Sequence, residues 1–176
     1  MNIHIRKEES EDFKAVFDLV KDAFEKEEMS DHQEQYLVER LRKSDAFVPE
    51  LSLVAQIDEK IVGYILLTKI KIIDNERVSE ALSLAPIAVL PAYQGKGVGA
   101  QLIKYAHEKA KALGFGVVVL LGHENYYPKF GYEMAKKYGI QLPFEVPDEN
   151  CMVIALTENA LQQVKGTVQY PKAFGI

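Results

Sequence analysis

Cysteine is almost absent from this sequence, and long hydrophobic runs are absent too. The only cysteine among 176 residues is Cys151, which excludes an intramolecular disulfide framework and any zinc site built from several cysteines. No apolar run approaches the roughly 20 residues of a membrane-spanning helix, and the first residues lack the apolar core of a signal peptide. With 48% hydrophobic residues, the chain can bury a core without disulfides or metal. We therefore expect one soluble, cytoplasmic domain spanning residues 1–176.

Basic residues are in the minority. Lys and Arg number 21 against 26 Asp and Glu, so the formal net charge is −5. This balance argues against a nucleic-acid partner, which usually requires a basic face, and against an anionic membrane surface. The spacing of His4, His32 and His107 resembles no metal site, so we expect no metal. Cys151 begins an apolar segment, where a buried structural thiol is more common than a nucleophile.

Apolar residues recur at helical spacing near the start of the chain. This periodicity predicts two helices, at residues 13–24 and 31–41. Ser10 and Asp31 stand before them as candidate N-caps, because their side-chain oxygens can accept hydrogen bonds from the first free N–H groups. A run of acids spans residues 22–34, and such runs usually form a solvated surface.

The pattern then changes to alternation. A short first strand and three longer strands are predicted, at residues 2–6, 51–57, 61–73 and 78–89. Tight turns join the three longer strands, which makes them antiparallel neighbours, because a parallel pair needs a long crossover. Pro86 lies inside the last of them and cannot donate a hydrogen bond, so we expect a bulge or a break in the pairing there.

Three glycines occur within five residues, at Gly95, Gly97 and Gly99. A helix is predicted directly after them, at residues 98–113 with Gly114 as its C-cap, and then a buried strand at residues 116–121, parallel to the strand before the helix. Glycine lets the backbone approach a ligand closely, and a helix N-terminus offers free N–H donors and the positive end of its dipole. This arrangement predicts a phosphate-binding loop, to which Lys96 adds a positive charge.

Two familiar phosphate motifs fit this loop poorly. A P-loop needs Ser or Thr after its lysine, whereas Lys96 is followed by Gly97. The dinucleotide pattern G-x-G-x-x-G/A is met by Gly95, Gly97 and Ala100, and Glu124 lies where a ribose-binding acid is sought. The loop, however, starts several residues after the strand ends, and an antiparallel meander precedes it. A dinucleotide-binding module is therefore a disfavoured alternative.

The loop resembles a motif of one enzyme family. Residues 94–99, Q-G-K-G-V-G, are similar to the Q/R-x-x-G-x-G/A motif of the GNAT superfamily of acetyl-CoA-dependent N-acetyltransferases. Residues 127–132, Y-P-K-F-G-Y, are similar to the family's Y-x-x-x-G-F, and residues 121–127 resemble its bacterial YhbS-type subgroup. The resemblance implies an α/β (α+β) fold: a mixed, mostly antiparallel central sheet with one splayed parallel strand pair and flanking helices. It covers a core of residues 1–157 and leaves residues 158–176 as a C-terminal extension.

The resemblance also implies where the co-substrate acetyl-CoA binds. Its pyrophosphate is expected on the backbone N–H groups of the loop, from Gln94, Gly95, Lys96, Gly97, Val98, Gly99 and Ala100. Its pantetheine arm is expected along Ile87, Ala88 and Val89, in a gap where two parallel strands separate, and Pro86 independently favours such a gap. The Ile87 N–H is expected to stabilise the thioester oxygen, for which one fixed donor contributes about 3 kcal/mol.

Acetyl transfer needs one group to donate a proton and another to accept one. By the resemblance, Tyr127 is the general acid, and its phenol, with an ordinary pKa of about 10, is protonated at neutral pH. Tyr126 is the substitute if the register is off by one. Where relatives often have a glutamate base, this chain has Ser83, which is too weak a base but can hold a water that relays the proton. The base is therefore unassigned, and the other candidates are Glu80, His123 and Glu124.

We predict an N-acetyltransferase that passes the acetyl group of acetyl-CoA directly to a primary amine of a small molecule or a protein, without a covalent enzyme intermediate. The alternative is a sensor or scaffold that binds acyl-CoA with little turnover, which Ser83 in place of an acid keeps open. If the acids of residues 22–34 line the acceptor cleft, they favour a cationic amine. No sequence feature decides between a monomer and a homodimer.

Overall fold

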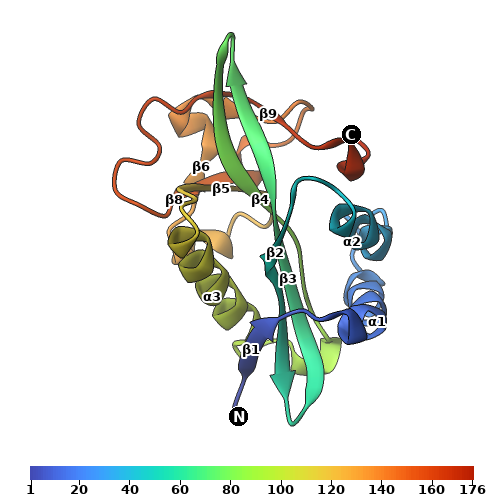
Figure 1. Cartoon of the computed structure of the whole chain (residues 1–176). Coiled ribbons are helices and arrows are strands. Elements are labelled where there is room, and N and C mark those ends of the chain that lie inside the picture. The colour runs from blue at the N-terminus through green and yellow to red at the C-terminus, as the bar shows by residue number, and fades with distance from the viewer.

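A nine-stranded mixed sheet forms the middle of the molecule (Figure 1). The computed structural model describes residues 1–176. The strands are β1 (His4–Lys7), β2 (Phe47–Ile57), β3 (Lys60–Asp74), β4 (Arg77–Val89), β5 (Val117–Leu121), β6 (Glu133–Met134), β7 (Ile140–Gln141), β8 (Cys151–Ala155) and β9 (Gly166–Gln169). β1 to β4 form an antiparallel meander, the order continues β4-β5-β8-β6, and β9 pairs with both β3 and β7. The predicted sheet, mostly antiparallel with a parallel β4–β5 pair, is confirmed.

Three α-helices flank the sheet: α1 (Phe13–Phe24), α2 (Glu34–Arg42) and α3 (Val98–Ala112). α3 covers one face, where its apolar residues pack with Leu53 and Ile65. α1 and α2 cover the other face, over Val54 and Tyr64. Successive strand residues point to opposite faces, so neighbouring positions such as Leu53 and Val54 serve different cores. In Figure 1, α3 lies to the left of the long β3–β4 hairpin, and α1 and α2 lie to its right.

Six short 3-10 segments connect the larger elements: η1 (Ser10–Asp12), η2 (Pro91–Tyr93), η3 (Tyr127–Phe130), η4 (Ala135–Tyr138), η5 (Asp148–Asn150) and η6 (Lys172–Phe174). η3 follows β5 and ends at Gly131, whose φ of 102° turns the chain away. No helix of the chain has the length and apolar character that crossing a membrane would require.

The parallel strands β4 and β5 pair over only two residues each. Leu82 lies opposite Val118 and Ser83 opposite Val119, and beyond these pairs the two strands separate. β5 continues to Leu121 with β8 on its other side, so the gap opens between β4 and β5 alone. The expected splayed pair is therefore present.

β4 also bulges where the proline predicts it. Leu84 pairs with Leu67 of β3, and Ile87 pairs with Ile65. Two residues of β4, one of them Pro86, therefore face a single residue of β3. The bulge directly precedes the stretch of β4 that borders the gap.

The two expected helix caps are wrong in detail. Ser10 does not cap α1; instead Glu9 forms a capping box with Asp12, whose Oδ2 accepts the Glu9 N–H at 2.8 Å. Asp31 does not cap α2 either, because its Oδ1 accepts the N–H of Gln33, which occupies the N-cap position itself. Both chain segments make one additional turn before their helix begins.

The C-terminal residues take part in the sheet. β9 runs antiparallel to β3 and parallel to β7, and η6 packs on α2, where Arg40 Nε donates to the Ala173 carbonyl at 2.9 Å. Periodicity missed β6, β7 and β9 because they have only two to four residues, too few for alternation to be visible. Residues 158–176 thus supply one strand of the sheet and a short segment that packs on α2.

Candidate active site

The glycine loop places free backbone donors at the start of α3. Gly95 and Gly97 have φ angles of 75° and 85°, a left-handed conformation that costs glycine little. The first bond of α3 runs from the Gln101 N–H to the Gly97 carbonyl, so the N–H groups before Gln101 have no partner in the helix. A Cβ at Gly95 or Gly97 would meet nothing within 4 Å, which means that the space beside the loop is open. An anion fits there, because free N–H groups and the positive end of the helix dipole meet at this point.

A hydrogen bond from the Gln94 side chain links this loop to the end of β4. Gln94 Nε2 donates to the Val89 carbonyl at 3.1 Å. Two lysines add positive charge beside the loop, since Nζ of Lys96 and Nζ of Lys60 lie 5.7 Å and 5.6 Å from the centre of the Tyr93 ring. Lys60 is the first residue of β3, far from the loop in sequence, and no motif indicated it.

β4 directs unpaired N–H groups into the gap beside β5. Leu90 donates its N–H to the Val62 carbonyl, just outside the β4–β3 ladder, at 2.9 Å. Successive residues of a strand direct their N–H groups to opposite sides. Ile87 and Val89 therefore direct theirs away from β3, toward the side where β5 has separated, and Ala88 is engaged with β3. The Ile87 N–H thus lies on the gap side of β4.

Tyr126 and Tyr127 follow β5 and have different surroundings. The Tyr126 hydroxyl lies beside the start of α3, because a Cβ built on Gly99 would be 3.0 Å from it and 4.0 Å from Ile87 Cδ1. The Tyr127 ring packs so closely on Gly122 that a Cβ there would overlap it. Burial raises the pKa of Tyr127 to about 12 and also raises the pKa of Tyr126. Both phenols are therefore protonated at neutral pH and able to donate a proton.

Ser83 lies where β4 and β5 separate, on the face opposite α3. Its side chain is buried, and it pairs across the ladder with Thr68 of β3. The Thr68 hydroxyl is also buried and has no hydrogen-bond partner, a second polar group that no motif indicated. The other candidate bases are further from this place: Glu80 is exposed on β4, and the loop after β5 exposes His123 and Glu124.

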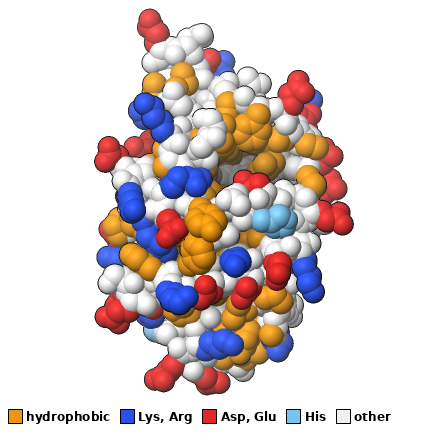
Figure 2. Space-filling view, turned by 90° about the vertical axis from the view of Figure 1, so that its right-hand side faces the viewer, with side chains coloured by type: hydrophobic (Ala, Val, Ile, Leu, Met, Phe, Trp, Pro, Cys, Tyr) orange, Lys and Arg blue, Asp and Glu red, His pale blue; other side chains and the backbone are white.

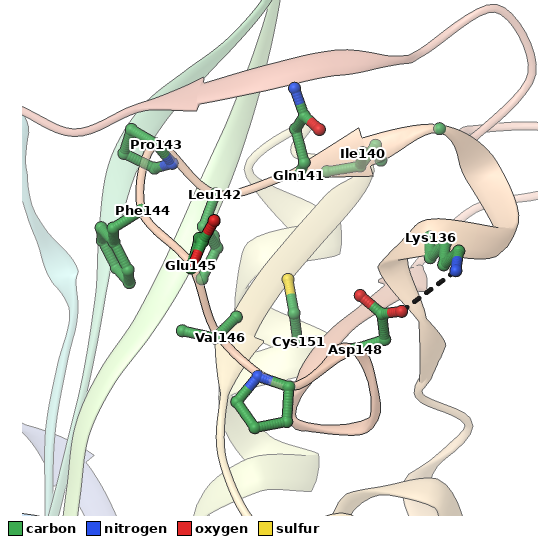
Figure 3. A pocket seen from close by; sticks show the side chains of 12 residues that line it. Lys136, Ile140, Gln141, Leu142, Pro143, Phe144, Glu145, Val146, Asp148 and Cys151 are labelled. Atoms are coloured by element: carbon green, nitrogen blue, oxygen red, sulfur yellow. Dashed lines mark hydrogen bonds and ion pairs between the residues drawn. The ribbon is translucent and has the colours of Figure 1, made fainter.

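A pocket of about 800 Å³ lies on this same face, beside the start of β8 (Figure 3). Cys151 points its sulfur into it, and Lys136 and Asp148 form an ion pair of 3.1 Å on its rim. Burial raises the pKa of the Cys151 thiol to about 11, so the thiol is protonated and unreactive at neutral pH. We call this the Cys151 pocket. The acids of residues 22–34 do not line it, and no group of three or more His, Cys, Asp or Glu is arranged to hold a metal ion.

The chain matches the model of one protein family and two named relatives. The acetyltransferase (GNAT) family model matches residues 13–132, which include the glycine loop, the gap and both tyrosines. YjhQ of Escherichia coli K12, named an uncharacterized N-acetyltransferase, is 39% identical over 120 residues, which cover 67% of this chain and 66% of YjhQ. YhbS of the same strain, also named an uncharacterized N-acetyltransferase, is 29% identical over 154 residues, covering 87% of this chain and 90% of YhbS.

Solved structures of two similar proteins have the same fold. The crystal structure of Escherichia coli YhbS in complex with CoA matches with a TM-score of 0.89 at 27% identity, covering 100% of this chain and 93% of that one. A GNAT family acetyltransferase from Brucella melitensis in complex with acetyl-CoA matches with a TM-score of 0.81 at 29% identity, covering 98% of each chain. The resemblance seen in the loop motif, including that to the YhbS type, is confirmed. Because the family model matches more than half of its length, this chain belongs to the GNAT family of acetyltransferases.

Proposed function

We propose that this enzyme transfers the acetyl group of acetyl-CoA directly to a primary amine. The observation that carries the proposal is the open glycine loop at the start of α3, which adjoins the gap between β4 and β5. An anion site and a slot for an extended arm thus lie side by side, as a CoA thioester requires. The CoA and acetyl-CoA complexes of two relatives support the same donor. No covalent enzyme intermediate is needed, because an amine attacks a thioester directly.

The donor is held by backbone groups. Residues 94–100 bind the pyrophosphate through the N–H groups at the start of α3, and the β4 stretch from Ile87 through Ala88 to Val89 binds the pantetheine arm. When bound, acetyl-CoA supplies an acetyl group already activated as a thioester. The Ile87 N–H, directed into the gap, donates to the carbonyl oxygen as that oxygen gains negative charge. A fixed donor of this kind contributes about 3 kcal/mol to the transition state.

The protons move through two different groups. As the new C–N bond forms and the C–S bond breaks, Tyr127 donates its proton to the leaving sulfur, which its high pKa permits because the phenol is protonated at neutral pH. The acceptor amine must first lose a proton. Ser83 lies where β4 and β5 separate, on the face of the sheet opposite α3. It holds a water that passes this proton outward.

Ligand-dependent unfolding followed by an activity assay tests the proposal. A ligand at 100 times its dissociation constant adds about 2.7 kcal/mol to the stability of the native state, and we expect this from acetyl-CoA and CoA. Release of free thiol from acetyl-CoA should then depend on an added primary amine. Stabilisation by NADH but not by acetyl-CoA would contradict the donor site.

A sensor or scaffold function is the second candidate, favoured by one observation. The position expected to hold a carboxylate base is occupied by the buried hydroxyl of Ser83. The same assay separates the two functions, because a sensor binds acetyl-CoA saturably and releases no thiol with any amine of a broad panel. Amine-dependent release at a rate that saturates with acetyl-CoA would exclude it.

A further inference from the structure

A second pocket lies beside α2, against the edge of β3. Its volume is about 610 Å³. On one side of it the Lys69 N–H donates to the Ala46 carbonyl, just before β2, at 3.1 Å. On the other side Lys71 pairs with Gln169, the last residue of β9. The pocket therefore lies between β2 and β9, which pair with the same edge of β3. α2 and the C-terminal segment form its outer wall.

This pocket has a strongly basic lining. Five cationic side chains line it: Arg40, Lys43, Lys69, Lys71 and Lys172. We call it the basic pocket. Two acids, Asp45 and Glu80, also line it, which leaves a surplus of positive charge in a chain whose net charge is −5. Figure 2 shows this side of the molecule, where several Lys and Arg side chains lie close together left of the centre.

The cations of the basic pocket form no ion pairs within the chain. None of its cations and neither acid belongs to any of the ion pairs of the structure, although Glu80 pairs with Lys71 in the β3–β4 ladder. Arg40 uses Nε to hold the Ala173 carbonyl, and its other guanidinium N–H groups stay available because the group has five donors. A concave site of one charge sign concentrates ligands of the opposite sign. Carboxylate and phosphate oxygens suit these donors, since charge-assisted hydrogen bonds are about twice as strong as neutral ones.

Tyr170 also lines the basic pocket. Its ring stacks on Phe144 with centroids 6.2 Å apart and lies 4.8 Å from Phe174. Burial, and after it the nearby Cys151 thiol, raises the pKa of Tyr170 to about 12, so its hydroxyl is protonated at neutral pH. Phe144 lines the Cys151 pocket, and the stacked pair of rings therefore separates the two pockets of this face.

The basic pocket lies close to the reacting centre. Lys69 follows Thr68, which pairs with Ser83, and Ser83 is the last β4 residue that pairs with β5. Neighbouring strands are about 4.8 Å apart, so β4, which borders the gap, is roughly 5 Å from β3, and the basic pocket lies at the other edge of β3. The buried, unpartnered Thr68 hydroxyl lies beside Ser83 on the face opposite α3, the face on which Ile70 and Tyr170 border the basic pocket.

We propose that the acceptor is a small primary amine that carries a carboxylate or phosphate group, and that the basic pocket binds this anionic group while the amine reaches the gap. The inference rests on the acetyl transfer proposed above. It reverses the charge preference expected from the acids of residues 22–34, which line neither pocket. A volume of about 610 Å³ lies in the range of small-molecule sites.

Matched pairs of amines test this proposal. Thiol release from acetyl-CoA is measured with ε-aminocaproate against its amide, and with aminohexyl phosphate against aminohexanol, so that the members of each pair differ in the anionic group alone. We expect kcat/KM to be about tenfold or more higher for the anionic member of at least one pair, as one charge-assisted contact implies. The pair that shows the larger preference distinguishes a carboxylate from a phosphate acceptor.

The variant Lys69→Gln with Lys71→Gln should abolish this preference by raising KM for the anionic amine. The control, Lys104→Gln with Lys111→Gln, removes two exposed lysines from α3 and should keep it. Stabilisation by CoA shows whether each variant is folded. Equal kcat/KM within both pairs, or a preference that survives the first variant, would overturn the proposal.

Amine binding in the presence of CoA, followed by thermal unfolding, separates this proposal from the proposed function. Charge-selective binding that disappears in Lys69→Gln with Lys71→Gln, without thiol release from any amine, would support the pocket and contradict acetyl transfer. Thiol release with neutral amines, together with no charge-selective binding, would support acetyl transfer and contradict the pocket.

Discussion

The imidazole Nε2 of His107 lies 2.8 Å from the phenol oxygen of Tyr132. Burial raises the pKa of Tyr132 well above its ordinary value and lowers the pKa of His107 to about 4. The phenol therefore donates to an unprotonated Nε2, and the ring is the neutral Nδ1–H tautomer. This bond ties α3 to the segment after η3, where the Tyr132 ring packs edge-on against Tyr127 at 5.9 Å. The proposed general acid is thus supported by a residue of the helix that begins at the glycine loop.

Acidic pH should weaken the hydrogen bond between His107 and Tyr132. An unfolded histidine has a pKa of about 6.5, whereas folded His107 has a pKa of about 4. Between these values the unfolded chain binds a proton that the folded chain does not, so the free energy of unfolding rises with pH through this window and the contribution is complete above about 6.5. In His107→Gln the amide oxygen accepts from Tyr132 without titrating. Urea unfolding at about pH 4.5 and 7.5 should show a smaller acid loss in the variant, and an equal loss would contradict the lowered pKa of His107.

Tyr127→Phe should slow acetyl transfer without preventing donor binding. The phenol proton is needed only when the sulfur leaves, and a positioned acid typically contributes 10²–10⁴-fold. We expect kcat to fall by about 100-fold or more, with the CoA-dependent gain in stability retained. Thiol release and thermal unfolding measure the two effects.

Tyr126→Phe is the matched comparison. It removes the neighbouring hydroxyl, which lies beside Gly99 at the start of α3, and should cost less in kcat than Tyr127→Phe. The opposite order would assign the acid to Tyr126.

The parts of the site that sequence predicts are those that depend on neighbouring residues. Gly95 and Gly97 take positive φ angles directly before a helix, and Pro86 disturbs the ladder because it lacks an N–H in any sheet. These consequences are local, so the loop, the bulge and the gap could be expected before the structure was known. The family resemblance rests on the same short runs.

The parts of the site that the sequence did not predict depend on which distant segments of the chain come into contact. Lys60 lies beside the same ring as Lys96 because the β2–β3 turn reaches the loop. Arg40 and Lys172 share a pocket because η6 packs on α2. Periodicity indicates that a strand exists and which face it buries, but it does not give the order of strands in a sheet or the path of a short segment. The acids of residues 22–34 are visible as a run in the sequence, whereas the cations of the basic pocket come from segments that are far apart in the chain.

Gly63→Ala should disturb the donor site through packing. No motif includes Gly63, yet a Cβ there would lie 2.8 Å from Val98 Cγ1 and 3.0 Å from Leu102 Cδ1, so β3 and the first turns of α3 touch at this point. Overpacking of this kind costs about 1–3 kcal/mol. It also moves the start of α3, so we expect weaker CoA binding in addition to a lower free energy of unfolding.

Gly114→Ala is the control for that variant. Gly114 lies at the far end of α3, and a Cβ built on it would meet nothing within 4 Å. Its φ of 93° is unfavourable for alanine by about 1–2 kcal/mol. Titration with CoA should give an unchanged dissociation constant for Gly114→Ala. An equal change in both variants would mean that general destabilisation, and not the position of α3, weakens the donor site.

A buried ion pair holds α2 against the first strand and should dominate stability. Arg42 Nη2 lies 2.6 Å from Glu8 Oε2, with side chains 11% and 2% exposed, and the Ser52 hydroxyl donates to Glu8 Oε1 at 2.8 Å while bonding the buried Tyr64 phenol. Removing one member leaves the other charged and buried, which typically costs 3–5 kcal/mol. We expect this loss in Glu8→Gln and in Arg42→Met.

The double variant tests whether the two residues act as a pair. Removing both charges leaves no buried ion, so its loss in urea unfolding should be smaller than the sum of the two single losses. The exposed pair of Lys14 and Asp18 provides the control, since a surface ion pair contributes about 0–1 kcal/mol and Asp18→Asn should change little. Additive losses in the double variant, or a Glu8→Gln loss no greater than that of Asp18→Asn, would show that Glu8 and Arg42 are solvated in solution and that α2 is held by its apolar face alone.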